Sequence, residues 1–295
     1  MNRTSFDILA VGVGVLLVLL SCSKASLGDE ELPDDSTTAD ANLVVSISQI
    51  EQRPFITTIS VDSATCTRLN FAVYNLSGTR LKQFNQKAGE SSFGTASFQL
   101  EPGTYRLVVL AHSSNGNPTM TDPAKIQFKN SQGFTDTFLY YATVIVTQEQ
   151  QTLNVSLDRI VSMCRFVIND AIPDEVTRLE FYYTGGSGAF NAATRLGCVN
   201  SKQDVKFDVT TGQSWTEYDL YTFLHKEEDV IHLTVTALDA VDNVVGKREL
   251  ELSMRQNQIT WATGYFFADQ PSDSWTVIPM TSLDKEWNNE IFTRY

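Results

Sequence analysis

Most of the chain after residue 42 alternates apolar and polar residues with a period of two. This is the repeat of a β-strand that buries one face, and Gly, Pro, Asn and Ser separate the successive runs. No segment beyond residue 43 carries an apolar stripe of helical spacing over three turns. The pattern predicts an all-β fold, with first strands at 43–50, 56–61, 69–74, 81–84, 96–100 and 105–109.

Later runs of the same kind predict strands at 138–147, 152–157, 159–168, 178–183, 204–209, 220–224, 230–237, 244–252, 259–267 and 275–278. The apolar density of 159–168 predicts a strand buried on both faces, which begins a second unit. Between the runs at 105–109 and 138–147, the segment 113–133 is predicted to be a long polar loop, interrupted only by Ile126 and Phe128. Pro102-Gly103 fits the two central positions of a type II turn.

The first residues do not fit this β-pattern. Arg3 precedes an apolar run, Ile8 to Leu20, which is well short of the ~20 residues that a spanning helix needs. A short apolar run behind a basic start is typical of a signal peptide. The run ends in Leu19-Leu20-Ser21-Cys22, which resembles the lipobox of bacterial lipoproteins. We therefore expect cleavage before Cys22 and attachment of fatty acids to that cysteine.

The next segment is polar and acidic. Residues 23–41 contain six acidic residues and almost no large apolar ones, so they cannot form a core. We expect a signal peptide at 1–21, a flexible tether at 22–41, and two antiparallel β-sandwich domains at 42–158 and 159–295. More than 270 residues remain after the signal peptide, which suits two sandwiches of ~100 residues.

Charge and composition narrow the choice of partners. The net charge is −13, and Arg3 and Asp7 cancel within the signal peptide, so the mature chain stays strongly acidic. Such a chain is repelled by phosphate, which argues against nucleic acid as a partner. Besides Cys22 there are three cysteines, Cys66, Cys164 and Cys198, without CxxC spacing and without clustered histidines. No metal or cofactor is expected, and the residues leave open whether two of these cysteines form a disulfide.

The remaining motifs give little sign of catalysis. Gly185-Gly186-Ser187-Gly188 lacks the Lys-Ser/Thr of a phosphate-binding P-loop and is interpreted as a flexible strand connection. Asp239–Asn243 lacks the Gly and the terminal Glu of an EF-hand and is interpreted as a hairpin turn. Trp215 is the aromatic residue most expected to be exposed. We expect no enzymatic activity.

Four segments together resemble one family. They are L-N-F-A-V-Y (69–74), F-Q-L-E-P-G-T-Y-R-L-V-V-L-A (98–111), T-L-N-V-S-L-D-R-I-V-S-M-C-R-F-V-I (152–168) and V-T-R-L-E-F-Y-Y-T-G (176–185). With the lipobox and the tether, the chain resembles the fimbrillin superfamily of Bacteroidales-type fimbriae, specifically the lipoprotein anchor subunits of the minor-fimbrium kind. The resemblance implies two transthyretin-like sandwiches in series, no catalysis, and assembly with other fimbrial subunits by strand exchange at the outer membrane.

The resemblance leaves alternatives open. The chain could be a polymerising stalk or tip subunit, or it could be a surface lipoprotein that binds glycans, which would show several exposed aromatic rings on one face. In stalk subunits of the family, a protease cuts after an arginine that follows the first strand, which removes the lipid and opens a groove for the next subunit. Here the first arginine after the tether is Arg53, and Pro54 follows it. A prolyl peptide is a poor substrate for most such proteases, so we expect strand 43–50 to stay attached.

Overall fold

The computed structural model describes residues 40–51, 53–54, 66–268 and 289–294, and these residues form β-strands joined by turns. The only helical element among them is one short 3-10 turn, η2 (Asn130–Gln132), and no helix there could cross a membrane. The all-β prediction is confirmed. The signal peptide, Cys22, most of the tether and the predicted strands at 56–61 and 275–278 lie outside the described residues.

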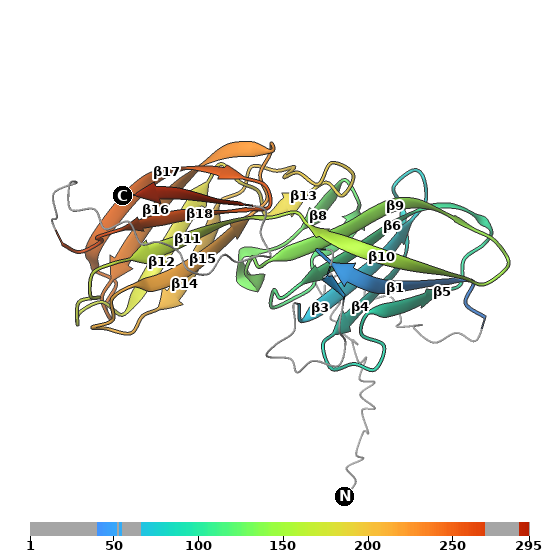
Figure 1. Cartoon of the computed structure of the whole chain (residues 1–295), viewed down its shortest axis with the longest axis horizontal. Helices are drawn as coiled ribbons and strands as arrows, with labels where there is room; N and C mark the ends of the chain where they lie inside the picture. Colours follow the sequence, from blue (N-terminus) through green and yellow to red (C-terminus); the bar gives the residue numbers. More distant parts are fainter. Residues whose placement is uncertain (1–39, 52, 55–65, 269–288, 295) are drawn as a thin grey trace, which may run out of the picture. The chain divides into compact units, whose positions relative to one another are not determined.

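The first half of the chain forms an eight-stranded sheet, which we call the N-terminal sheet (Figure 1). Its order is β2-β1-β10-β9-β6-β3-β4, and β5 also pairs with β1. The strands are β1 (Leu43–Ile50), β2 (Arg53–Pro54), β3 (Arg68–Tyr74), β4 (Arg80–Lys87), β5 (Thr95–Phe98), β6 (Gly103–His112), β9 (Thr137–Val146) and β10 (Gln151–Arg159).

β10 connects the two parts of the N-terminal sheet. Its residues 151–157 pair with β1, and its last two, Asp158 and Arg159, pair with β9. The β1–β10 pair is parallel, as are the β11–β18 and β18–β19 pairs described below. The antiparallel arrangement expected from the sequence holds for the other strand pairs of the described residues, and these three pairs are the exceptions. Each parallel pair joins strands that lie far apart along the chain, as parallel pairs must.

The inward faces of these strands enclose a hydrophobic cluster that includes Leu69, Phe71 and Leu107. The alternation at 69–74 and 105–109 predicts that Phe71 and Tyr105 lie in this core, and Phe71 is fully buried, with no exposed surface. Tyr105 was expected in the same core but is only partly buried, because its hydroxyl group reaches the surface and donates to the carbonyl of Glu101 at 2.7 Å.

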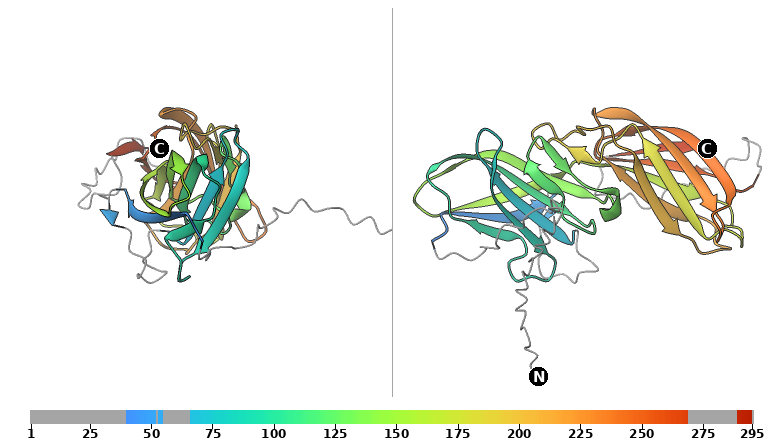
Figure 2. Two further views of the ribbon diagram at one scale, coloured as in Figure 1. Left: turned by 90° about the vertical axis from the view of Figure 1, so that its right-hand side faces the viewer. Right: turned by 180° about the vertical axis from the view of Figure 1, so that it is seen from behind.

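The second half forms two four-stranded sheets, which we call the C-terminal sheet pair (Figure 2). One has the order β15-β11-β18-β19 and the other β14-β12-β16-β17. A second hydrophobic cluster, which includes Phe166, Phe181 and Leu233, lies between them. The strands are β11 (Ser162–Ile168), β12 (Arg178–Thr184), β14 (Gln203–Asp208), β15 (Thr216–Thr222), β16 (Glu228–Leu238), β17 (Val244–Arg255), β18 (Gln258–Gly264) and β19 (Asn289–Arg294).

A separate three-stranded sheet has the order β13-β8-β7. It consists of β7 (Thr119–Asp122), β8 (Lys125–Gln127) and β13 (Ala189–Phe190). The polar loop predicted at 113–133 is therefore wrong in part, because Met120, Ile126 and Phe128 are buried and draw this segment into the fold. They belong to a third hydrophobic cluster, which also contains Val161 and Phe223 and which we call the junction cluster.

The junction cluster explains why two strands are buried on both faces. In β3, Ala72 and Tyr74 point into it, while Phe71 and Val73 point into the first core. In β11, Met163 and Val167 belong to it, while Phe166 belongs to the second core. The prediction of a strand buried on both faces is confirmed for β11, although that strand begins at Ser162 and Arg159 ends β10.

The turn predicted at Pro102-Gly103 differs from a type II turn. Such a turn needs a positive φ at its glycine, and Gly103 is absent from the glycines that have one. Gly103 instead begins β6 in extended conformation. The ring of Tyr105 lies over it, so that a Cβ at this position would be 3.4 Å from the Tyr105 hydroxyl oxygen.

Candidate functional site: the first strand and its groove

The first strand, β1, follows directly after the tether and lies between two neighbours (Figure 1). It pairs in parallel with β10 from Leu43 to Ile50, and its first half pairs in antiparallel fashion with β5. The boundaries predicted for this strand are confirmed. Because it is paired along both edges, β1 behaves as an interior strand although it begins the fold.

Apolar side chains of β1 fill the first core. Leu43, Val45, Ile47 and Ile50 are each no more than 5% exposed. The spacing changes from two to three after Ile47, where the register with β10 shifts between Ile47 and Gln49. Such a bulge inserts one extra residue and returns the next apolar side chain to the core. The groove that holds β1 therefore has four apolar positions with an uneven spacing.

Asn42 fastens the beginning of β1. Its side chain donates two hydrogen bonds, to the carbonyls of Leu100 and Thr147, both at 2.8 Å. Its side-chain oxygen accepts a hydrogen bond from the Leu100 amide at 3.0 Å. Its own backbone donates to the carbonyl of Phe98 and accepts from the amide of Gln151. Asn42 is 5% exposed, so its own polar groups are removed from water and paired.

Glu51 fastens the other end of β1. Its backbone has a positive φ of 48°, which turns the chain from β1 back into β2. The Glu51 amide donates to the carbonyl of Leu157 at 2.9 Å, and its carboxylate accepts from the backbone amide of Arg159. Both ends of β1 are therefore tied to residues far away in the sequence.

Arg159, in turn, is held within the interior. Its guanidinium forms two hydrogen bonds of 2.7 Å with the carboxylate of Asp136 and lies 4.8 Å from the centre of the Phe138 ring. Its side chain is 1% exposed. A buried charge of this kind is tolerated because it is paired in a bidentate geometry.

The candidate processing residue, Arg53, lies in the two-residue strand β2. Arg53 pairs with Ile50, and Pro54 pairs with Gln49, so the backbone on both sides of the Arg53–Pro54 bond belongs to a hairpin with β1. A protease must bind its substrate as an extended, accessible strand, and a paired hairpin hinders this in addition to the proline ring.

The cysteines beyond the lipobox show no arrangement for chemistry. Cys66, Cys164 and Cys198 are all free thiols, so no two of them form a disulfide in this structure. Burial raises the pKa of Cys66 to about 12 and raises the pKa of Cys164 as well, which keeps both thiols protonated and unreactive. The apolar pattern around Cys164 predicts a small buried hydrophobic residue there, and its burial confirms this.

The glycine-rich connection Gly185–Gly188 is closely packed. A Cβ on Gly186 would lie 2.1 Å from the Thr222 hydroxyl oxygen, and one on Gly188 would lie 3.1 Å from the Phe134 ring. These glycines let β13 approach β8. The segment is a strand connection as predicted, and its glycines serve close packing.

Two further candidates have simple roles. Asp239 accepts hydrogen bonds from the amides of Val241 and Asn243 and from the Asn243 side chain, which holds its pKa below the usual value and closes the predicted hairpin turn. Trp215 is 49% exposed, as predicted. The other exposed aromatic residues in the described part of the chain, Tyr182 and Tyr265, come from separate segments.

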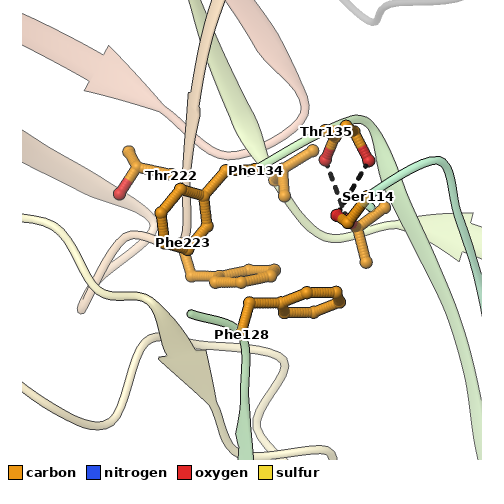
Figure 3. A pocket seen from close by; sticks show the side chains of 8 residues that line it. Ser114, Phe128, Phe134, Thr135, Thr222 and Phe223 are labelled. Atoms are coloured by element: carbon orange, nitrogen blue, oxygen red, sulfur yellow. Dashed lines mark hydrogen bonds between the residues drawn. The ribbon is translucent and has the colours of Figure 1, made fainter. Parts of the chain in front are cut away.

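A small hollow lies at the junction cluster, among side chains that include Ser114, Phe128, Thr135 and Phe223 (Figure 3). The hydroxyl oxygens of Ser114 and Thr135 are 3.4 Å apart, and the Phe128 and Phe223 rings stack with their centres 6.0 Å apart. The space among these side chains is too small to hold a water molecule. It is a packing gap and cannot hold a substrate.

Sequence reasoning identified β1 and Arg53 but missed Asn42 and Glu51. An asparagine before a strand normally indicates a turn, and the partners of Asn42 lie 58 and 105 residues away. The one local signal was an Asn placed directly before a run of β-branched residues. Cys22 lies outside the described residues, so its lipidation stays a prediction.

Comparison with known proteins assigns the chain to a family. It resembles in structure the fimbrial anchor protein Mfa2 from Porphyromonas gingivalis, with 13% identity, a TM-score of 0.39 and coverage of 70% of this chain and 81% of that one. It also resembles a fimbrial assembly protein from Parabacteroides distasonis, with 12% identity, a TM-score of 0.37 and coverage of 76% and 89%. No curated protein matches its sequence. The family model of the fimbrillin-A associated anchor proteins Mfa1 and Mfa2 matches residues 52–256, and the chain belongs to this family of fimbrial proteins.

Proposed function

We propose that this fimbrial subunit is the non-enzymatic anchor of its fimbrium. Fatty acids on Cys22 hold it in the outer membrane, the tether spans the distance from the membrane to the fold, and other subunits attach to the folded part by strand exchange. In this role the subunit keeps its first strand. A stalk subunit, by contrast, would lose that strand together with the lipid.

The pairing of β1 is the observation that supports this proposal most directly. β1 is the covalent connection between the tether and the fold, and it is paired on both edges and fastened at both ends. A strand held in this way keeps the fold connected to Cys22. The Arg53–Pro54 bond, which a protease would have to cut, lies in a paired hairpin.

The N-terminus of the subunit in native fimbriae tests the proposal. Fimbriae are sheared from cells, the subunit is isolated, and its N-terminus is determined by intact-mass analysis together with N-terminal sequencing. We expect an acylated N-terminal Cys22 and an intact Arg53–Pro54 bond. An N-terminus at Pro54 or beyond would contradict the anchor role and favour a polymerising subunit.

The attachment to lipid has its own test, because the chain offers a matched control. Cys22→Ser removes the proposed acylation site, and Cys198→Ser makes the same change at a cysteine that is exposed in the fold. We expect only Cys22→Ser to abolish incorporation of labelled fatty acid and to release the protein from the membrane fraction. Continued labelling of the Cys22→Ser protein would place the lipid elsewhere.

We also propose that the chain divides into two domains, at 42–158 and 159–295. Two separate hydrophobic clusters support this division. The junction cluster and the β8–β13 pair join residues from both sides of the boundary, so we expect the two domains to unfold together. Calorimetry that resolves two independent transitions would contradict this coupling.

A further inference from the structure

We propose that Asn42 is the residue that determines which strand the β1 groove accepts. The groove requires an extended segment with an amide side chain at its first position, followed by apolar residues at the first, third, fifth and eighth positions after it. The inference rests on the proposed function, because it concerns the strand that an anchor subunit must retain. It goes beyond that function by naming the chemistry of the strands that can compete with β1.

The polar end of the groove is built for an amide. It presents two acceptors, the carbonyls of Leu100 and Thr147, and one donor, the Leu100 amide. An amide side chain offers two N–H donors and one oxygen acceptor, so a single Asn satisfies all three groups. The fit is complete, and none of these groups needs water.

Other side chains leave this end of the groove unsatisfied. An Asp has nearly the shape of Asn but is acceptor-only when ionised, so it would place an oxygen against the carbonyl oxygens of Leu100 and Thr147. An Ala or a Val would remove the partner of the buried carbonyl and amide of Leu100 and of the part-buried carbonyl of Thr147. Removing one partner from a buried hydrogen bond costs the desolvation free energy of the group left behind, and here three groups are left.

The apolar end of the groove adds a second requirement. Leu43, Val45, Ile47 and Ile50 are the positions that it buries, and the bulge after Ile47 sets the gap before the last of them. At the bulge, the Ser48 hydroxyl donates to the carbonyl of Val155 at 3.0 Å. A strand without the bulge would turn its last apolar residue away from the core, since a shift of one residue reverses the face.

This double requirement excludes the other segments of the same chain. Asn42 is the only asparagine in the sequence that has large apolar residues at the first, third and fifth positions after it. The C-terminal strand reads Asn289-Glu290-Ile291-Phe292-Thr293-Arg294, which places Glu290 and Arg294 at two of the apolar positions. We therefore expect that a second copy of this chain cannot fill the groove with that strand.

Peptide exchange into the mature full-length chain tests the inference. The probe is a fluorescent peptide with the sequence of residues 40–51, and the chains are Asn42→Asp and the matched control Gln49→Glu. Both substitutions turn an amide into a carboxylate on the same strand, but Gln49 is exposed. We expect the Asn42→Asp chain to take up at least about tenfold more peptide than the control, because its own strand can no longer donate to the carbonyls of Leu100 and Thr147.

A second arm uses the wild-type chain and does not depend on the folding of a variant. The chain is held just below its thermal midpoint, where the fold opens transiently and β1 with it, in the presence of either the Asn peptide or the same peptide carrying Asp at its third residue. We expect the Asn peptide to be taken up about tenfold more than the Asp peptide. Equal uptake of the two peptides would overturn the inference, as would equal uptake by the Asn42→Asp and Gln49→Glu chains.

The outcome is separate from that of the proposed function. If the peptides do not discriminate while native fimbriae contain the intact N-terminus, β1 is retained without a role for Asn42. If the peptides discriminate while the native subunit begins at Pro54, the groove is selective but belongs to a polymerising subunit.

Discussion

The first and the last described strands of the chain are held very differently. β1 pairs with β10 on one edge and with β5 on the other, and hydrogen bonds of Asn42 and Glu51 secure its two ends. Among the residues that the structure describes, β19 pairs with β18 alone, in parallel, from Asn289 to Arg294. In Figure 1, β1 lies beside β10, whereas β19 is the last strand in the order of its sheet. Both are terminal strands in a parallel pair, but only β1 has an interior position.

The difference in pairing predicts that β1 is held more firmly in the fold than β19. A strand with partners on both edges must break two ladders to leave, whereas an edge strand must break one. The segment leading to β19 has its own fastening, because the carboxylate of Asp170 accepts hydrogen bonds from the amides of Phe266, Phe267 and Ala268. This fastening lies before β19 and leaves β19 with a single neighbour. We therefore expect β1 to open only with the fold and β19 to open earlier.

Among the variants that test this comparison, Phe71→Ala should cause the largest loss in the free energy of unfolding. Phe71 belongs to the same core as Leu43, Val45 and Ile47, so its removal leaves a cavity in the core that β1 covers. We expect a loss of about 3–5 kcal/mol in the free energy of unfolding, measured by urea denaturation. Hydrogen exchange should quicken in β1 more than in β19.

Leu81→Ala is the control for this prediction, because Leu81 is 39% exposed and lies on the edge strand β4. It should change the free energy of unfolding by less than about 1 kcal/mol. If Phe71→Ala has as small an effect as Leu81→Ala, the assignment of the core that β1 covers is wrong.

The next prediction concerns the loss of stability at acidic pH. Burial, together with the nearby charge of Arg68, lowers the pKa of His112 from 6.5 to about 3. Its ring accepts a hydrogen bond from the Ser114 amide and is 2.8 Å from the Asn70 side-chain oxygen, so the neutral form fits this site. Below pH 6.5 the unfolded chain binds a proton that the folded chain does not, and stability falls as the pH falls.

We expect His112 to lower the free energy of unfolding by about 2 kcal/mol between pH 6.5 and pH 5, before most carboxylates titrate. Urea denaturation at several pH values measures this slope. His112→Gln keeps a polar side chain and should flatten it. A slope that is unchanged in His112→Gln would show that other groups cause the acid sensitivity.

Asp170→Asn tests the comparison at β19, the other of the two strands. The substituted amide keeps one acceptor oxygen and loses the other, so at least one of the three amide hydrogen bonds is broken. We expect a loss of about 1–2 kcal/mol in the free energy of unfolding. Exchange in β19 should quicken, and exchange in β1 should follow the lower free energy of global unfolding and still occur after that of β19. Unchanged exchange in β19 would contradict a role of Asp170 in holding this part of the chain.

The smallest effect should come from Ser48→Ala, which removes the hydrogen bond to the Val155 carbonyl at the bulge of β1. We expect a loss of about 0.5–1 kcal/mol in the free energy of unfolding. The neighbouring exposed residue provides the control, since Gln49→Ala should change the free energy of unfolding by less than about 0.5 kcal/mol. Identical denaturation curves for the two variants would mean that the bulge adds no stability.

The sequence predicts the strands far better than their partners. The alternation of apolar residues locates β1 and β16 closely because it depends on neighbouring residues alone. It cannot show that β1 pairs with β10, more than 100 residues away, or that the pair is parallel. The strand conformation of Gly103, with the Tyr105 ring packed over it, was also not evident from the Pro-Gly pair.

Some elements carry too weak a pattern to be predicted. β13 has only two residues, and β19 reads Asn-Glu-Ile-Phe-Thr-Arg, with two large apolar residues in a polar context. The strands β7 and β8 lie in a polar segment. Their buried apolar residues cannot be recognised from the sequence, because they pack against distant residues of the junction cluster. Asn42 was missed for the same reason, because its function arises from three distant backbone groups.

Native-state hydrogen exchange followed by mass spectrometry tests the central claim most directly, because it compares the two terminal strands in one sample. Exchange is measured in the peptides that contain Leu43–Ile50 and Asn289–Arg294 at increasing concentrations of denaturant. The account predicts that β1 exchanges only through global unfolding, whereas β19 exchanges through a smaller opening of lower free energy. Exchange of β1 at or before that of β19 would contradict the claim that the first strand is the fixed one.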